Sequence, residues 1–338
     1  EHARARIGPQ GTPAQRSALW LAFRHLLPYP RRLRLVVSLL RVYQRSGLRS
    51  VLRRSGLLAR FGAEAERLDA MLPALPDRFF SPPVTVPPVG PRRYRVGLLS
   101  GCVMSTLFTP SNEATLRLLQ HAGCEVVIPR GQVCCGALNI HNGDPDGAKA
   151  MARRNIAAFA AEELDAIIVN AAGCGATMKE YGDLLADDAV WCERARHFAG
   201  KVRDVCEFLD AVLPPTTVAA VARQRVTYQD PCHLAHGQGV RTAPRRLLDR
   251  IEGIELVEMP QSDRCCGSAG IYNIMHPELA EPMLAAKMQH IAATGAERVI
   301  APNPGCILQL RYGAQRYGPA VRVDHLVDLL AEVQGLVP

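Results

Sequence analysis

The sequence predicts an α/β protein with two repeated Rossmann-like, cysteine-rich domains that follow a basic helical segment. From about residue 93 onward, short apolar runs alternate with helical stretches, which is typical of α/β units with mostly parallel strands. The same order of runs, glycines and cysteines then occurs again, and self-similarity over so long a period indicates duplicated domains. We therefore expect a basic helical segment and Pro-rich linker over 1–92 and cysteine-rich domains over 93–221 and 222–338.

Six apolar runs are the expected strands. Helix-start signals such as Asp144-Pro145 and His276-Pro277 lie between them, because proline is favoured in the first turn of a helix. In chain order the runs are Arg95–Ser100, Glu125–Pro129 and Ala166–Asn170 in the first repeat, and Arg225–Asp230, Glu255–Pro260 and Arg298–Pro302 in the second.

The positive charge is concentrated at the start of the chain. Residues 1–60 contain thirteen Arg, no Lys and one acid, so this segment carries +12 and the rest −4, against +8 overall. A solvated linker, docking to a partner or membrane, and nucleic-acid binding are the alternatives. Nucleic acid is disfavoured because no recognition module is evident and only 5% of residues are aromatic. No run approaches the roughly 18 apolar residues of a membrane span, and no signal peptide is evident.

A helix over Arg31–Arg45 is expected inside the basic segment. Pro28 and Pro30 precede it and Gly47 ends it. Helical spacing places Arg34, Ser38, Arg41 and Arg45 on one stripe, with Leu33, Val36, Val37, Leu40 and Tyr43 facing away from it. The apolar face favours docking to partner subunits or a membrane surface over a free linker. A Pro-rich linker follows over 82–91.

Eight of the eleven cysteines recur at matching positions. In the first repeat 31 residues separate Cys102 from the Cys134-Cys135-Gly136 motif, and 37 more lead to Cys174. The second repeat has spacings of 32 and 38 residues between Cys232, Cys265-Cys266-Gly267 and Cys306. Each cysteine follows an expected strand, and ligands bind at the carboxyl ends of parallel strands. Four thiols per repeat are therefore expected to converge.

Clustered thiolates are soft ligands that suit an iron–sulfur cluster or zinc. Adjacent cysteines reach one small ion only with strain, which favours a multi-iron cluster over zinc. A catalytic or switchable dithiol and buried structural cysteines stay open as alternatives. Cys124, Cys192 and Cys206 have no counterparts in the second repeat. They are expected to be ordinary core or surface residues rather than ligands.

Other chemistry is weakly indicated. His233 and His236 could ligate a metal, hydrogen-bond a cluster sulfur or act in acid–base chemistry, or could be ordinary surface residues. Val103 stands opposite His233 in the first repeat, so this histidine is not part of the repeated pattern. The glycines of Gly237-Gln-Gly239 lack the third glycine of a dinucleotide fingerprint, and no phosphate loop is evident. No flavin or nucleotide site is expected.

The two cysteine patterns resemble the paired "CCG" cysteine-rich domains. That family includes the CCG-containing component of heterodisulfide reductase, the lactate-utilisation iron–sulfur protein, and the iron–sulfur subunits of glycolate oxidase and anaerobic glycerol-3-phosphate dehydrogenase. The stretches 228–239, 265–273 and 303–309 look most like the glycolate oxidase subunit. The resemblance implies a cluster, with [4Fe-4S] the expected type, held by Cys102, Cys134, Cys135, Cys174, Cys232, Cys265, Cys266 and Cys306.

Two features depart from the family pattern. The pattern ends in Cys-x-x-Cys, but Ala171 and Asn303 occupy the first of those positions, which leaves four candidate ligands in each repeat. The glycolate oxidase subunit is also expected to begin with a ferredoxin-like domain, and its motifs are not in this sequence. Together with the absence of an initial Met, this predicts an N-terminally incomplete chain.

The resemblance implies an electron-transfer subunit of a glycolate dehydrogenase complex. Flavin subunits would oxidise glycolate to glyoxylate, and this chain would pass electrons toward quinone or another acceptor without oxidising glycolate alone. The alternatives are a lactate dehydrogenase or heterodisulfide reductase-type subunit, and a metal-free scaffold. The expected location is cytoplasmic, with peripheral association at the inner face of the cell membrane.

Overall fold

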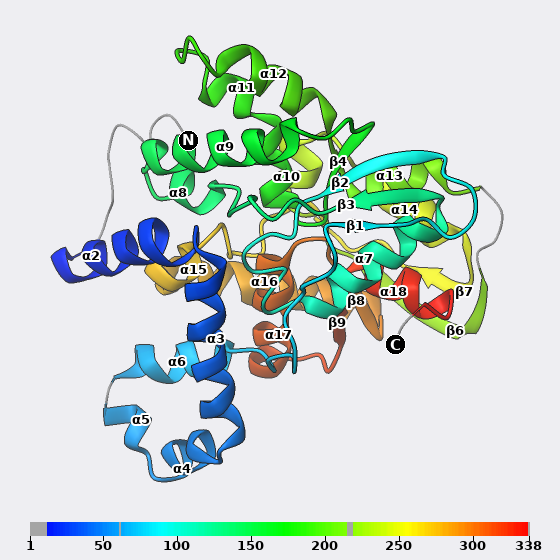
Figure 1. Ribbon diagram of the computed structural model, residues 1–338. Helices are drawn as coiled ribbons and strands as arrows, with labels where there is room; N and C mark the ends of the chain where they lie inside the picture. The colour runs from blue at the N-terminus through cyan, green and yellow to red at the C-terminus, as the bar shows by residue number, and fades with distance from the viewer. Residues whose placement is uncertain (1–11, 61, 215–218, 337–338) are drawn as a thin grey trace.

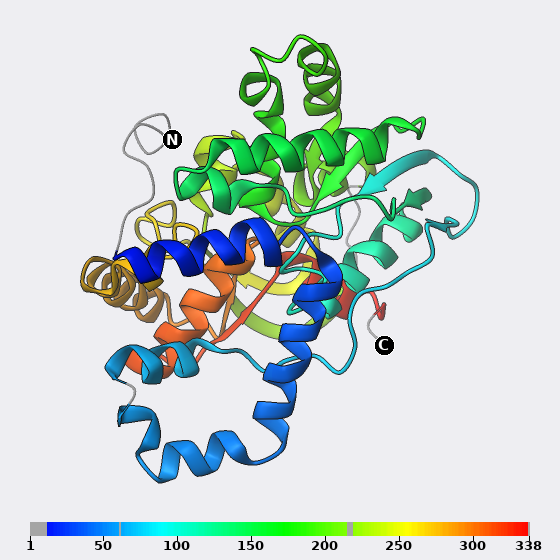
Figure 2. The same ribbon diagram turned by 60° about the vertical axis from the view of Figure 1, so that its left-hand side comes forward.

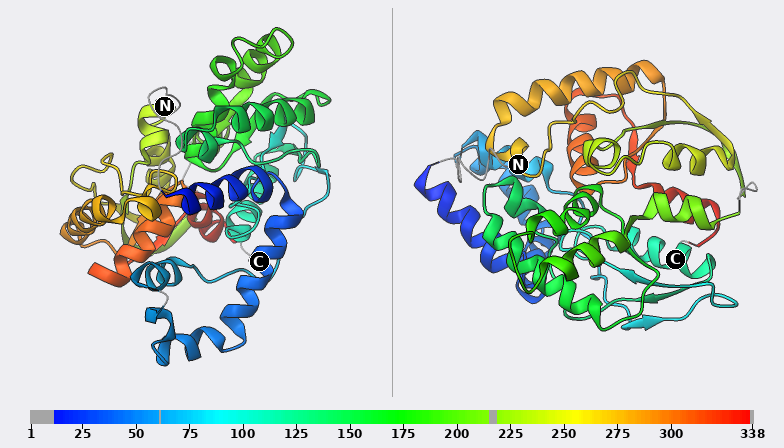
Figure 3. Two further views of the ribbon diagram at one scale, coloured as in Figure 1. Left: turned by 90° about the vertical axis from the view of Figure 1, so that its left-hand side faces the viewer. Right: turned by 90° about the horizontal axis from the view of Figure 1, so that it is seen from above.

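The computed structural model describes residues 12–60, 62–214 and 219–336, and it contains two α/β repeats with a helical N-terminal segment on one side. Figure 1 shows this segment, α2 to α6, projecting from the body of the protein. Seen from above, in the right panel of Figure 3, the two repeats lie side by side.

The first repeat contains a five-stranded sheet in the order β1-β3-β2-β4-β5. Strands β3, β2, β4 and β5 are parallel, and only β1 runs antiparallel, against β3. Its strands are β1 (Thr85–Val86), β2 (Tyr94–Leu98), β3 (Cys124–Val127), β4 (Ala166–Val169) and β5 (Val202–Asp204). Its helices are α7 (Thr109–His121), α8 (Ala137–His141), α9 (Pro145–Ala160), α10 (Ala172–Lys179), α11 (Tyr181–Leu184), α12 (Cys192–Lys201) and α13 (Val205–Val212).

The second repeat contains a parallel sheet in the order β7-β6-β8-β9. Its strands are β6 (Ala219–Tyr228), β7 (Ile251–Leu256), β8 (Arg298–Ile300) and β9 (Arg322–Asp324). Its helical elements are the π-helix η2 (His233–Gly237), α14 (Ala243–Asp249), α15 (Tyr272–Met275), α16 (Pro277–Thr294), α17 (Pro304–Tyr317) and α18 (Leu326–Val333).

The two sheets share one topology. Counted from the first parallel strand of each repeat, both have the order 2-1-3-4. The central strands also match in register, because Val96 pairs with Val126 and Ala166 while Val226 pairs with Leu256 and Arg298. The α/β class is confirmed, and five of the six expected runs lie mostly within a strand. The sixth is displaced, because β7 ends at Leu256 and overlaps the expected run Glu255–Pro260 only at its first two residues. The short strands β5 and β9 were not expected from the sequence, because three residues show too little periodicity.

The repeats exchange their terminal helices. The last helix of the second repeat, α18, packs on the first helix of the first repeat, α7, and α13 packs on α14 in the reciprocal way. Side chains of both repeats therefore share one core, which includes Leu118 and Leu119 of α7 and Leu329 and Leu330 of α18. This reciprocity orients both sheets so that the carboxyl ends of their strands face the same region.

The N-terminal segment connects to both repeats. Arg24 is ion-paired with Asp144, the N-cap of α9, and Arg67 donates hydrogen bonds to the carbonyls of Asn273 at 2.8 Å and Ile274 at 3.1 Å. The segment consists of α2 (Pro13–Leu21), the π-helix η1 (Ala22–Leu26), α3 (Pro30–Arg45), α4 (Leu48–Arg54), α5 (Leu57–Arg60) and α6 (Ala63–Met71). Figure 2 shows α2 and α3 running across one side of the protein.

The expected orientation of α3 is wrong. Leu33 and Val37 are buried in this chain against Leu75, so the face expected to dock elsewhere is partly internal. The arginine stripe also faces the protein, because Arg34 donates to the Phe80 carbonyl at 2.9 Å and Arg41 lies over the Phe79 ring. Two of the thirteen arginines, Arg4 and Arg6, lie outside the described residues.

Among the described residues, every helix is too short or too polar to cross a lipid bilayer.

Candidate functional site

All eight recurring cysteines follow the carboxyl ends of the first three parallel strands of their sheets. Cys102 comes after β2, the Cys134-Cys135 pair after β3, and Cys174 after β4. The second repeat uses β6, β7 and β8 in the same way. The strand order reverses between the first and third strands, and this switch point is where open α/β sheets bind ligands.

The four thiols of the first repeat form a continuous group. The sulfur atoms of Cys102 and Cys134 lie 3.4 Å apart, and Cys135 interacts with both Cys134 and Cys174. The hydrogen bond with Cys134 and then burial raise the pKa of Cys102 well above its usual range. The pKa of Cys135 is raised in the same direction, since its hydrogen bond with Cys174 and burial outweigh the opposing effect of Cys134.

The second repeat groups its thiols in the same order. Cys232 interacts with Cys265, and Cys266 interacts with Cys265 and Cys306. The pKa of Cys265 is lowered by hydrogen bonds from Cys232 and Cys266, and the backbone N–H of Gly267 donates to its sulfur at 3.4 Å. The pKa of Cys306 is also lowered, chiefly by its hydrogen bond with Cys266.

The last cysteine of each group occupies the third position of a helix. Cys174 lies in the first turn of α10 and Cys306 in the first turn of α17. The unpaired N–H groups at a helix N-terminus favour negative charge, and therefore a thiolate. Each of these helices begins shortly after a strand ends. Its first residue, Ala172 in α10 and Pro304 in α17, is one that is readily accepted at the start of a helix.

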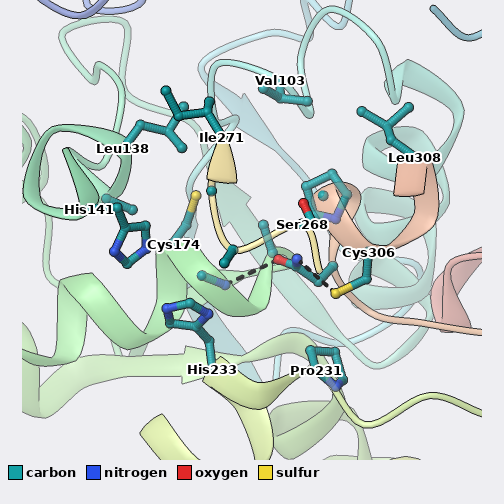
Figure 4. A pocket seen from close by; sticks show the side chains of 18 of the residues that line it. Val103, Leu138, His141, Cys174, Pro231, His233, Ser268, Ile271, Cys306 and Leu308 are labelled. Carbon is teal, nitrogen blue, oxygen red and sulfur yellow. Dashed lines mark hydrogen bonds between the residues drawn. The ribbon is translucent and has the colours of Figure 1, made fainter. Parts of the chain in front are cut away.

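The two helix N-termini meet across the interface between the repeats. The N–H of Ala172 donates to the Pro302 carbonyl at 3.3 Å, and the N–H of Gly173 donates to Oδ1 of Asn303 at 3.2 Å. The amide of Asn303 also donates to the sulfur of Cys306 at 3.4 Å. One side chain thus contacts both cysteine-bearing helices. Dashed lines in Figure 4 mark hydrogen bonds here, one of them ending at Cys306.

A single cavity of about 320 Å³ touches all eight cysteines. Its other walls are mainly apolar and include Val103, Leu138, Ile271 and Leu308. In Figure 4, Cys174 and Cys306 lie on opposite sides of this space. The two cysteine groups therefore share one cavity, as expected if the two repeats face each other.

The expected histidines differ in their positions. His233 lines the cavity, with Nδ1 3.6 Å from the Cys232 sulfur. His236 instead makes contacts outside the cavity lining, with Arg241 at 2.8 Å and Asp263 at 3.5 Å. His141 also lines the cavity, and its ring centroid is 4.9 Å from that of His233. No sequence signal singled out His141, because it lies outside the repeated motifs.

The three remaining cysteines lie elsewhere. Cys124 and Cys206 are buried in the shared hydrophobic core, and Cys192 begins α12. These positions fit the expectation that the three cysteines are core or surface residues rather than ligands. Burial raises the pKa of Cys124 to about 12.

The cysteine groups fit a multi-iron cluster better than a single ion. Each supplies four adjoining soft donors from three strand ends, and backbone and side-chain N–H groups point at sulfur in the second repeat. Across the described ranges, no group of three or more His, Cys, Asp or Glu side chains has the arrangement of a metal-ion site.

Two buried residues behind the cysteine pairs were not singled out from the sequence. Asn155 accepts from the N–H of Val133 at 2.8 Å and donates to the Cys134 carbonyl at 3.1 Å. Lys287 donates to the carbonyls of Gln261 at 2.7 Å and Ser262 at 3.3 Å. Burial lowers the pKa of Lys287, while nearby Cys266 and Cys306 oppose that shift. Both residues lie within helices and outside the cysteine motifs. The only sequence feature that could have identified either of them is that Lys287 is a charged residue inside α16.

Comparison with known protein families matches three parts of the chain. A family described as "Cysteine-rich domain" matches residues 96–179 and 226–311, and therefore both repeats. A second family, described as "Glycolate oxidase iron-sulfur subunit, linker region", matches residues 14–75. The second match covers the helical segment that contacts both repeats.

Individual proteins agree with these matches. The chain is 45% identical over 319 residues to the probable glycolate oxidase iron–sulfur subunit of Bacillus subtilis (strain 168), covering 93% of this chain and 72% of that protein. It is 32% identical over 236 residues to lactate utilization protein A of Oceanobacillus iheyensis, covering 70% and 96% of the two chains.

A crystal structure of a hypothetical protein from Helicobacter pylori has a similar fold. The TM-score is 0.54 at 9% sequence identity, and the match covers 80% of this chain and 53% of that chain. This likeness concerns the fold alone.

Proposed function

This chain belongs to the glycolate oxidase iron–sulfur subunit family, and we propose that it is the electron-transfer subunit of a complex that oxidises glycolate to glyoxylate. The observation that carries the proposal is the grouping of eight cysteines around one cavity. Sulfur ligands held by a rigid α/β scaffold suit an electron carrier, whose protein sets the position and potential of the cofactor.

Four cysteines in each repeat are the proposed ligands of a [4Fe-4S] cluster, which would supply one-electron transfer. The chain's own residues shape this site: Cys174 and Cys306 each lie in the first turn of a helix, and apolar walls limit the access of water. The proposed ligands are Cys102, Cys134, Cys135, Cys174, Cys232, Cys265, Cys266 and Cys306.

Flavin-containing subunits are the proposed electron donors, and quinone or another carrier is the proposed acceptor. The complex would then act as a dehydrogenase, with glycolate oxidised on a different subunit. The proposed location is cytoplasmic, with peripheral association at the inner membrane face. The N-terminal segment, which matches the linker region of glycolate oxidase subunits over residues 14–75, is the proposed contact with other subunits.

A lactate-oxidising complex is the second candidate. It is favoured by the similarity to lactate utilization protein A, which covers less of this chain than the first relative does. Purifying the complex through this chain and measuring reduction of an artificial acceptor with glycolate or lactate distinguishes the two. Faster turnover with lactate would contradict the glycolate assignment.

Cluster binding is tested by iron and sulfide analysis with electron paramagnetic resonance after anaerobic purification. We expect Cys135→Ser to lose roughly half of the iron, because one of two four-cysteine groups is damaged. Cys192→Ser is the matched control and should retain all of it. Absence of iron from the unaltered protein would support a metal-free scaffold instead.

A further inference from the structure

The two cysteine groups have equivalent ligands but different surroundings. Cys306 and Cys174 both occupy the third position of a helix, but the residue just before each helix differs. It is Asn303 in the second repeat and Ala171 in the first. Asn303 donates an N–H···S hydrogen bond to Cys306 at 3.4 Å, and an alanine side chain has no donor.

A second difference lies behind the cysteine pairs. Helices α9 and α16 both begin with proline, and Asn155 and Lys287 each follow that proline by ten residues. Both side chains are buried, and both contact the loop that leads into the cysteine pair. The equivalent position is thus a neutral amide in the first repeat and a lysine in the second.

Lys287 is held beside the second group by its hydrogen bonds to the carbonyls of Gln261 and Ser262, in the loop that leads into the cysteine pair. At this position its ammonium interacts electrostatically with Cys266, Cys306 and Cys265. Asp263, which also interacts with the ammonium, is paired with Arg241. With only 1% of Lys287 exposed, little solvent screens this interaction. Hydrogen bonds to ligand sulfur and positive charge nearby both stabilise the added electron of a reduced cluster.

We propose that Asn303 and Lys287 tune the second cysteine group to a higher reduction potential than the first. They are positioning residues that act through the thiolates, and the inference rests on the proposed cluster binding. The second group is therefore reduced before the first. Asn303 also accepts from Gly173 at 3.2 Å, so the same side chain fixes the contact between the two groups.

The test is a redox titration of the anaerobically purified protein, followed by electron paramagnetic resonance. Asn303→Ala removes both hydrogen bonds, whereas Asn303→Asp keeps the acceptor for Gly173 but loses the donor to Cys306. Lys287→Met removes the charge and keeps an unbranched side chain in the buried site. Lys201→Met is the control, because Lys201 donates to the Leu164 carbonyl at 2.9 Å, away from the cavity.

We expect two midpoint potentials in the unaltered protein. Asn303→Ala, Asn303→Asp and Lys287→Met should each shift the higher potential downward, with a larger shift for Asp than for Ala because a negative charge is added. The lower potential should shift less than the higher one in the Asn303 variants and should not change in Lys287→Met. Both potentials should stay unchanged in the control, Lys201→Met. Equal potentials in the unaltered protein, or shifts confined to the lower one, would overturn the inference while leaving cluster binding intact. Protein without iron would instead refute the proposed function itself.

Discussion

Gly136 and Gly267, which follow the two cysteine pairs, have backbone conformations that other residues rarely adopt. Their φ angles are +86° and +90°. A Cβ atom on Gly267 would lie 2.8 Å from the carbonyl oxygen of Ala280, and one on Gly136 would lie 3.0 Å from the Cα of Ala148. The glycines therefore allow each cysteine pair to turn tightly against a long helix, which places the sulfur atoms in the cavity.

Replacing Gly267 with alanine should destabilise the protein. The positive φ angle costs about 1–3 kcal/mol for a residue with a side chain, and the contact with the backbone of Ala280 adds to it. Gly90→Ala is the control, because Gly90 has a φ of +81° and no atom lies within 4 Å of the position that its Cβ would take. Denaturant unfolding measures both. A loss of stability no larger for Gly267→Ala than for Gly90→Ala would rule out the close contact as a cause.

Helix α3 is the element for which the structure differs most from the sequence-based expectation. It is apolar on two sides. Its inner side contributes Leu33 and Val37 to the protein, and its outer side leaves Leu35, Leu39 and Val42 each 62% exposed. The described residues 12–60 contain no acid, although Asp69 and Asp77 from the following segment pair with Arg49, Arg53 and Arg45. We infer that the outer face of α3, defined by Leu35, Leu39 and Val42, carries the proposed assembly contact.

The double variant Leu35→Gln, Leu39→Gln should weaken assembly without changing the stability of the isolated chain. Each leucine contributes roughly 1.5–3 kcal/mol when fully buried at an interface, so losing both should lower the affinity by at least about a hundredfold. Co-purification with flavin subunits and recovery with membranes are the readouts. Val190→Gln is the control, since Val190 is 66% exposed on another part of the surface. Unchanged recovery of the double variant would leave α3 as a structural linker only.

At the scale of the whole molecule, the repeats are joined close to the cysteine groups. His325, at the N-cap of α18, donates from Nε2 to the Asn170 carbonyl at 2.9 Å, while its Nδ1 accepts from the N–H of Val327. Asn170 lies just before Ala171, at the start of the helix that carries Cys174. The contact therefore links the packing of α18 to the first cysteine group.

Burial lowers the pKa of His325 to about 4, which predicts loss of stability in acid. An unfolded histidine titrates near pH 6.5, so between about pH 6.5 and 4 the unfolded state binds the proton first. This contribution to stability is complete above about pH 6.5 and falls as the pH drops, by at most about 3 kcal/mol. Burial raises the pKa of Asp328 to about 6, and this carboxyl has the opposite effect over part of that range.

Comparison with His325→Asn separates the two effects, because asparagine can still cap α18 but does not titrate. The difference in free energy of unfolding between the two proteins, measured from about pH 7 to about pH 4.5, should shrink as the pH falls. A difference that is constant with pH would show that His325 is not held in its neutral form.

The sequence by itself determined the α/β class, the duplicated pattern and the eight recurring cysteines. These features depend on residues that are neighbours in the sequence. An apolar run predicts a strand, and a cysteine that follows a parallel strand lies at the carboxyl edge of the sheet. The boundaries of the domains and the ligand role of the cysteines remain predictions. The short strands β5 and β9 depend on pairing with β4 and β8, and three residues cannot specify that pairing alone.

Only the tertiary structure decided which surfaces meet. Helix α3 has two apolar sides, and its periodicity cannot say which one packs inside. The shared cavity depends on the exchange of α13 and α18 between the repeats, which is a property of core packing between distant segments. The unequal surroundings of the two cysteine groups have the same origin, because Asn303 and Lys287 acquire their roles only where a partner sulfur or carbonyl lies within reach.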